Sequence, residues 1–342
     1  MNRHNNPRWR RYSRSRARHE RLWSQKHECS KKARNLRKSP KKTKRVREGV
    51  PFEPFFNPVS AQSPLSLFTN FEQTNAFFKK LEGAFKKHTE VYIDIQEVQE
   101  IEIESILVLL ALIKRYTKNR TNLKIRGNSP KAGTQAAQIL YDSGYYEEFR
   151  SIYPHRNPSG RVCRMISKKG FKIDPIMASE MALDAGEEIF GLRDYPLGVY
   201  PTLIEAMGNT REHAEPNVDA AVRWWTMFFV DKANKRACFI IYDGGVGILG
   251  SLRSRLSKWF TLFNAPDEDV LHDLMIGKQQ SRTRLPYRGK GLPAMARAVE
   301  RGQIHNLKIL SNRAMGDISA NHYQKLPSDF RGTMLYWEVL KP

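Results

Sequence analysis

The sequence contains only three cysteines, and these lie far apart. Cys29, Cys163 and Cys238 fit neither the spacing of a zinc site nor a disulfide framework. Long apolar runs are also missing, because the longest run, residues 106–113, is far shorter than the ~18 residues of a membrane span. We therefore expect reduced thiols, no transmembrane segment, no signal peptide and a cytoplasmic location. Cys238 lies in an apolar run and is expected to be a buried small side chain.

Acidic residues are scarce in residues 1–50, where three of them stand against nineteen Lys and Arg residues, a net charge of +16. The whole chain has a net charge of +23, so most of the excess lies in this tail. Apolar residues are too few there to bury a core, and we expect the tail to be disordered. Trp9, Tyr12 and Trp23 are interleaved with arginines, which favours nucleic acid as a partner through phosphate contacts and base stacking. An anionic membrane surface, an acidic protein or a purely solubilising role stays open.

A strand–helix alternation follows a linker rich in Pro and Phe at residues 50–58. The pattern predicts helices over 70–87, 103–118 and 132–142, with strands over 91–95 and 123–126. This order indicates a small α/β layer with a parallel pair of strands. Residues 151–195 are expected to be a connector, with a short strand over 171–174 and a helix over 175–186.

Three features of this layer, Asp94, residues 109–115 and the run Ser143-Gly144-Tyr145, resemble the STAS domain of anti-sigma-factor antagonists. The resemblance implies a STAS-like domain over residues 61–150. In that family a serine near the start of a helix accepts a phosphate, and Glu104, next to Ser105, stands at this position here. The layer is expected to be a scaffold, with a fixed negative charge at Glu104 as the alternative.

Glu205, Asn209 and His213 recur every fourth residue in a stretch of good helix formers. On a helix these three side chains share one face. A carboxylate one turn from a carboxamide suits Mg²⁺ and a water, because the amide oxygen is a hard ligand and the carboxylate can orient or deprotonate a nucleophile. A solvated helix face with ordinary polar residues is the alternative.

Two glycine-rich segments follow in the chain. The apolar run 237–242 predicts a buried strand that ends at Asp243-Gly-Gly-Val-Gly247, where Gly245 and Gly247 can take a positive φ and admit a ligand close to the backbone. An Asp at this place can accept a hydrogen bond from an exocyclic amine. The second segment, residues 289–292, precedes a predicted helix over 293–300, so its free N–H groups, the helix dipole and the Lys290 charge suit an anion.

This order of segments resembles the GHKL family of ATPases and kinases. The N-box Glu-x-x-x-Asn, two glycine boxes and a final Gly-Thr match the following residues: Glu205, Asn209 and His213; Asp243, Gly245 and Gly247; Gly289, Gly291 and Leu292; Gly332 and Thr333. The resemblance implies a general base at Glu205, a Mg²⁺ ligand at Asn209 and an adenine contact at Asp243. It implies phosphate contacts at residues 289–291. The segment 248–288 would be a lid, whose basic residues Lys278, Arg282, Arg284 and Arg288 meet the terminal phosphate or lie on a solvated surface.

These patterns predict an α/β protein in four parts: a basic tail and linker (1–60), a STAS-like layer (61–150), a connector (151–195) and a GHKL sandwich with a mixed sheet backed by helices (196–342). The leading function is a regulatory switch that hydrolyses ATP with Mg²⁺ and reports lid closure to a protein partner. The alternatives are a serine/threonine kinase of the anti-sigma-factor type and a nucleic-acid-binding module with a vestigial ATP site. The family resemblance also suggests a homodimer.

Overall fold

The computed structural model describes residues 58–119, 122–149, 162–166, 173–191, 193–213, 224–231, 234–255, 265–278 and 291–341. The contacts divide the chain into residues 1–53 and 54–342, and every described residue belongs to the second unit. The predicted tail and nearly all of the predicted linker therefore lie outside the described residues.

A small parallel sheet begins the described chain. Its strands, in order, are β1 (Val59–Ser60), β2 (Glu90–Asp94) and β3 (Lys124–Gly127). The helices that accompany it are α2 (Phe71–Lys87), α3 (Ile103–Asn119) and α4 (Gln135–Asp142). The predicted alternation of strands and helices and the parallel pair of strands are confirmed, and β1 adds a third strand from the end of the predicted linker.

A second sheet of five strands is antiparallel throughout. Its strands, in spatial order, are β4 (Val162–Ile166), β5 (Trp225–Asp231), β6 (Arg236–Asp243), β8 (His322–Leu340) and β7 (His305–Asp317). Every residue of β5 is buried, and so is nearly every residue of β6, because helices cover both faces of this sheet. The described chain is thus an α/β structure with one parallel and one antiparallel sheet, and the prediction of a mixed sheet over 196–342 is wrong.

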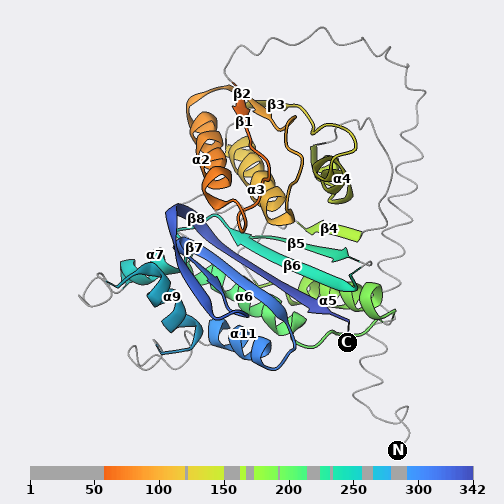
Figure 1. The fold of residues 1–342 in the computed structure, drawn as a ribbon, viewed down its shortest axis with the longest axis vertical. Coiled ribbons are helices and arrows are strands. Elements are labelled where there is room, and N and C mark those ends of the chain that lie inside the picture. The colour runs from red at the N-terminus through yellow and green to blue at the C-terminus, as the bar shows by residue number, and fades with distance from the viewer. Residues whose placement is uncertain are drawn as a thin grey trace, which may run out of the picture. The chain divides into compact units, whose positions relative to one another are not determined.

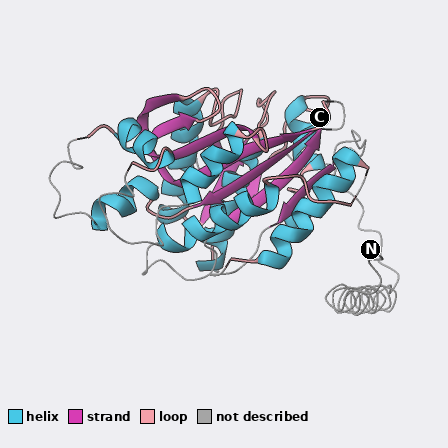
Figure 2. Cartoon of the chain, turned by 90° about the horizontal axis from the view of Figure 1, so that it is seen from below, coloured by secondary structure: helices cyan, strands magenta, loops and turns pink. Residues whose placement is uncertain are grey.

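Helices cover the two faces of the five-stranded sheet (Figure 1). α2 and α3 pack against one face. Three helices cover the other face: α5 (Pro175–Phe190), α6 (Val199–His213) and α11 (Gly291–Glu300). Seen from below, a layer of helices lies in front of the strands (Figure 2). Two further helices, α7 (Ile248–Arg255) and α9 (Asp267–Met275), lie near β7 (Figure 1).

The longest apolar run, residues 106–113, lies in α3 and is buried along its whole length. It packs in one core with residues of both sheets, for example Ile93 of the small sheet and Ile240 of the large one. An α-helix that is covered on several sides needs apolar residues all round, which explains the run. No helix in the described ranges has the length and apolarity needed to cross a membrane.

The alternation of side chains along β6 decides which residues face which helices. Phe239 and Ile241 pack in the core with α5 and α6, whereas Cys238, Ile240 and Tyr242 pack in the core with α2 and α3. Because successive side chains of a strand point to opposite faces, Asp243 follows Ile241 onto the α6 face. The last residue of β6 is thereby directed toward the helix that carries Glu205 and Asn209.

The segment before α6 differs from the prediction. Ile173 and Asp174 are not in a strand; the Asp174 carboxylate instead caps α5 and accepts a hydrogen bond from the Met177 N–H at 3.0 Å. α5 continues past Gly186 and ends at Gly191, whose φ of +72° closes the helix. Gly186 has another role, since a side chain there would collide with the Asp194 carbonyl oxygen. β4 and α5, both in the predicted connector, pack as parts of the five-stranded layer.

Candidate functional site

Three neighbouring strands carry polar residues in one row at the end of the large sheet. Asp243 of β6 pairs with Thr333 of β8, which pairs with Ser311 of β7. Their apolar neighbours two residues away, Ile241 and Ile309 among them, belong to the core on the α6 face. The alternation of side chains therefore places all three polar residues on that same face.

Asp243 is a buried carboxyl group, with 3% of its surface exposed. Burial raises its pKa to about 7, although hydrogen bonds from the Gly245 N–H, the Thr333 N–H and the Thr333 hydroxyl oppose the rise. The Gly245 N–H donates to Asp243 Oδ1 at 2.9 Å. These neighbours fix the position of the Asp243 carboxyl group. A hydrogen-bond acceptor that selects one polar group of a ligand has to be fixed in this way.

The turn after Asp243 fits closely against β7. Gly247 has a φ of +80°, and a side chain there would collide with Ser311 and Asn312. Gly245 does not take a positive φ; its N–H group donates a hydrogen bond to the Asp243 carboxyl group. Only one of the two glycines that the sequence singled out therefore needs the left-handed region.

The first turn of α7 follows this loop directly. The Ile248 N–H donates to Ser311 Oγ at 2.9 Å and to Thr333 Oγ1 at 3.2 Å. Thr333 thereby links Asp243 to the start of α7. Gly332 lies just before it with a φ of +87°, and a side chain there would collide with the Asp243 carbonyl oxygen. The predicted Gly-Thr pair thus lies against the predicted glycine box.

Glu205 and Asn209 lie on α6, and both are half-buried. The backbone of Gly291, the first residue of α11, lies against both side chains: a Cβ atom on Gly291 would stand 2.6 Å from Glu205 Oε2 and 3.5 Å from Asn209 Oδ1. Only glycine fits here without a shift. The structure therefore brings together the predicted N-box and the second glycine box, which are far apart in the sequence.

The amide nitrogen of Asn209 is buried and has no hydrogen-bond partner among the described groups. Since the two ends of an amide group are assigned from their hydrogen bonds, either the nitrogen or the oxygen of Asn209 can be the atom that lacks a partner among the described groups. No cluster of three or more His, Cys, Asp or Glu side chains in the described ranges could hold a metal ion by itself. An amide with a nearby carboxylate fits Mg²⁺ that arrives with phosphate and keeps several waters.

Several predicted residues either are not described or lie away from this cluster. Gly289 and Lys290, and Arg282, Arg284 and Arg288 of the predicted lid, are outside the described residues. His213 ends α6, but its side chain is not among those described. Leu292 is buried in the core beneath α11. Lys278 forms an ion pair with Asp273 at 3.6 Å, at the end of α9.

The sequence reasoning missed Asn312. Its side chain donates to the Val246 carbonyl at 2.9 Å and accepts from the Gly250 N–H at 3.0 Å, so it holds the loop on both sides of Gly247. Asn312 has a φ of +53° at an irregularity in the pairing of β7 with β8. Asn is among the few residues that tolerate this conformation, but a lone Asn in a strand gives no signal of its own.

The thiol of Cys238 lies away from this site and donates a hydrogen bond to Glu338 Oε1 at 3.9 Å. It is buried, as predicted, and burial raises its pKa to about 12.

Comparison with known proteins gives no further guide: no protein-family model, curated protein or solved structure matches this chain.

Proposed function

We propose that this chain binds ATP with Mg²⁺ on the α6 face of the five-stranded sheet, in the manner of GHKL proteins, and acts as a regulatory switch. The observation that carries the proposal is the meeting of Glu205, Asn209 and Gly291 at the start of α11. A helix whose first N–H groups lie beside a carboxylate, and beside an amide nitrogen with no partner among the described residues, suits a metal-bound phosphate.

Each residue then has a distinct role. Asp243, held by Gly245 and Thr333, accepts a hydrogen bond from the exocyclic amine of adenine. Asn209 supplies an oxygen to Mg²⁺, whose positive charge offsets charge on the phosphate oxygens. Glu205 orients or deprotonates the group that attacks the terminal phosphate. Gly291, with Gly289 and Lys290 before it, contacts the phosphates.

Binding is tested by calorimetric titration of the full chain with a non-hydrolysable ATP analogue and Mg²⁺. We expect wild type to bind and Asp243→Asn to bind at least tenfold more weakly, because its nitrogen meets the adenine amine with a second donor. Asn209→Ala should lose most of the Mg²⁺ dependence. Glu180→Ala, an exposed acid on α5, is the matched control and should bind as wild type does. Absence of binding by wild type, or equal binding by Asp243→Asn, would refute the proposal.

Turnover separates the two chemistries that the site allows. Free phosphate that depends on Glu205 identifies an ATPase, whereas phosphate on protein, detected by mass spectrometry, identifies a kinase. Glu205→Ala should bind the nucleotide and yield neither product.

The other partners stay predictions. Nucleic-acid binding by residues 1–50 falls on a segment outside the described structure, and the protein partner and the homodimer are predictions from the family resemblance. The STAS-like character of the small parallel layer is likewise a proposal, supported by the order of its strands and helices.

A further inference from the structure

The glycine loop is held from behind by two arginines. The Gly244 carbonyl, between Asp243 and Gly245, accepts a hydrogen bond from Arg115 Nη1 of α3 at 3.2 Å and another from Arg331 Nε of β8 at 3.2 Å. Hydrogen bonds from charged donors are stronger than those between neutral groups. The main chain next to the buried carboxyl group is thus fixed by cations on the face away from α6.

Arg331 is in turn bound to the N-terminal layer. Its Nη1 forms an ion pair with Glu82 of α2, and Glu82 also accepts a hydrogen bond from the Tyr116 hydroxyl of α3 at 2.8 Å and pairs with Lys86 at 3.2 Å. Burial alone would raise the pKa of Glu82, but Arg331, Tyr116 and Lys86 together hold this pKa below its usual value. The carboxylate is therefore charged at neutral pH and joins both helices to the loop.

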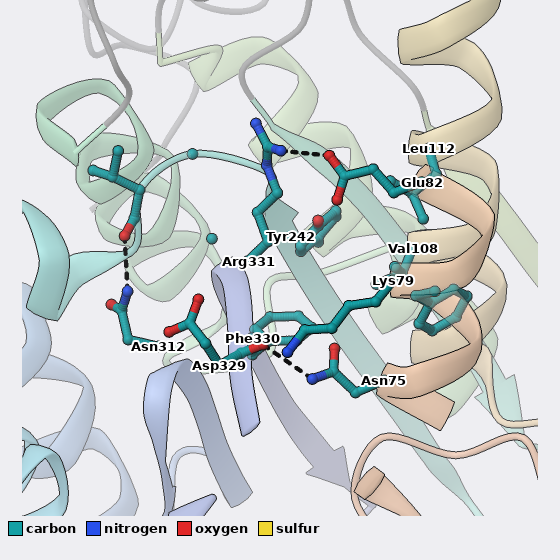
Figure 3. Close-up of a pocket in the computed structure, with 14 residues that line it drawn as sticks. Asn75, Lys79, Glu82, Val108, Leu112, Tyr242, Asn312, Asp329, Phe330 and Arg331 are labelled. Atoms are coloured by element: carbon teal, nitrogen blue, oxygen red, sulfur yellow. Dashed lines mark hydrogen bonds and ion pairs between the residues drawn. The ribbon is translucent and has the colours of Figure 1, made fainter. Parts of the chain in front are cut away.

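A cavity of about 470 Å³ lies beside these contacts, between α2 and α3 on one side and β6, β7 and β8 on the other (Figure 3). Gly245 and Val246 of the glycine loop line it, together with Phe78, Tyr242 and Phe330. Arg331 and Glu82 both line the cavity, and the close-up shows the ion pair between them (Figure 3). On the side of the cavity, the glycine loop has few apolar contacts. The hydrogen bonds from the two arginines therefore contribute to holding the loop in place.

We infer that Glu82, Arg115 and Arg331 are positioning residues for nucleotide binding and couple the N-terminal layer to the site. The inference rests on the proposed function for its ligand. Bonds that fix Gly244 also fix Asp243 and Gly245 on either side of it. Nucleotide bound on the α6 face then strengthens the contacts with α2 and α3, and those contacts strengthen nucleotide binding by the same factor, because coupling between sites is reciprocal.

The test uses two variants of the full chain that leave the α6 face untouched. Arg115→Met removes a donor and keeps the length of the side chain, and Glu82→Gln removes the charge that orients Arg331. Each should bind the ATP analogue at least about tenfold more weakly than wild type, the lower end of the range expected for one charge-assisted bond. The matched controls are Glu72→Gln, an exposed acid on α2, and Arg126→Met, an exposed arginine on β3 paired with Glu90. Both should bind as wild type does.

Hydrogen exchange supplies a readout that does not depend on ATP. In the absence of nucleotide, residues 242–248 should exchange faster in both variants than in wild type and the controls, by more than any change in global stability measured in urea accounts for. Bound nucleotide should slow exchange at residues 79–87 in wild type and much less in the variants. Affinities within twofold of wild type, together with unchanged exchange in the loop, would overturn the inference. If wild type binds no nucleotide, the proposed function fails, and exchange in the loop alone decides whether the arginines position it.

Discussion

Glu104 is a buried carboxyl group that should make the stability of this protein depend on pH. It lies in the first turn of α3 with 2% of its surface exposed. Its Oε1 accepts hydrogen bonds from Ser66 Oγ and the Leu67 N–H, each at 3.1 Å. Burial, with a smaller contribution from Glu102, raises its pKa to about 8 despite these bonds. The group is therefore largely protonated in the folded protein at neutral pH.

The magnitude follows from the difference between the folded and unfolded states. A pKa raised from 4.5 to about 8 corresponds to a contribution of at most about 5 kcal/mol. Because the folded pKa is the higher one, the folded state holds more protons between these two values, and stability falls as the pH rises through this range. The contribution is fully present below pH 4.5 and is lost by about pH 8. Glu104→Gln should remove this dependence, since its amide oxygen can accept the same two hydrogen bonds.

The assay is urea unfolding of both proteins at intervals between pH 5 and pH 9. We expect the free energy of unfolding of the variant to exceed that of wild type by an amount that grows with pH, up to the ~5 kcal/mol above. The matched control is Glu100→Gln, which replaces an exposed acid in the loop before α3. Its free energy of unfolding should depend on pH as that of wild type does. Parallel curves for Glu104→Gln and wild type would refute the reasoning, because they would mean that the carboxyl group titrates alike in both states.

Two further predictions concern Gly332, beside Asp243, and Cys238, in the core on the other face of the sheet. Gly332→Ala should destabilise the protein by more than 2 kcal/mol in urea unfolding, because a positive φ alone costs about 1 kcal/mol and the new Cβ also collides with the Asp243 carbonyl. Gly133→Ala is its control, since Gly133 has a φ of +84° and open space around it; equal costs for the two variants would contradict the collision. Cys238 should resist iodoacetamide at pH 8 in the folded protein and react in urea, as followed by peptide mass mapping, because burial raises its pKa to about 12. Rapid labelling without urea would show that the strand opens.

Local patterns predicted most of the helices and strands. The helix over 70–87 and the strand over 237–242 correspond to α2 and β6 within a residue or two, because each has a clear period or a compact apolar run. α4 begins at Gln135 and not at Ala132, because the Thr134 hydroxyl caps it and accepts the Ala137 N–H at 3.1 Å. Such boundaries depend on single side chains, which periodicity does not register.

The arrangement of the strands could not be read from the sequence. β8 lies between β6 and β7 in the sheet. The last strand of the chain therefore pairs with β6, and β7, which precedes it in the sequence, lies at the edge. β4, formed by part of the predicted connector, pairs at the opposite edge next to β5. Pairing of this kind depends on contacts between distant residues, and hydrophobic alternation alone leaves the order of strands undetermined.

Part of the candidate site could likewise be predicted from the sequence, and part could not. Glu205 and Asn209 could be paired from their spacing on one helix, and their position against Gly291 followed from the motif order. Nothing in the sequence links Ser311, Asn312, Arg115 or Arg331 to the loop, although Arg115 ends the run 109–115 and Arg331 precedes the Gly-Thr pair. Glu82 and Arg331 are 249 residues apart in the chain, and no local pattern links them.

Strand geometry explains why the proposed nucleotide site and the N-terminal layer meet at one loop. Tyr242 and Asp243 must point to opposite faces of the sheet because they are neighbours on β6. Tyr242 therefore lines the cavity beneath α2 and α3, while Asp243 lies on the α6 face. The Gly244 carbonyl, the next group along the chain, is bound by Arg115 and Arg331. A movement of this loop toward a ligand on one face consequently alters contacts on the other, so three consecutive residues are sufficient to connect the two layers.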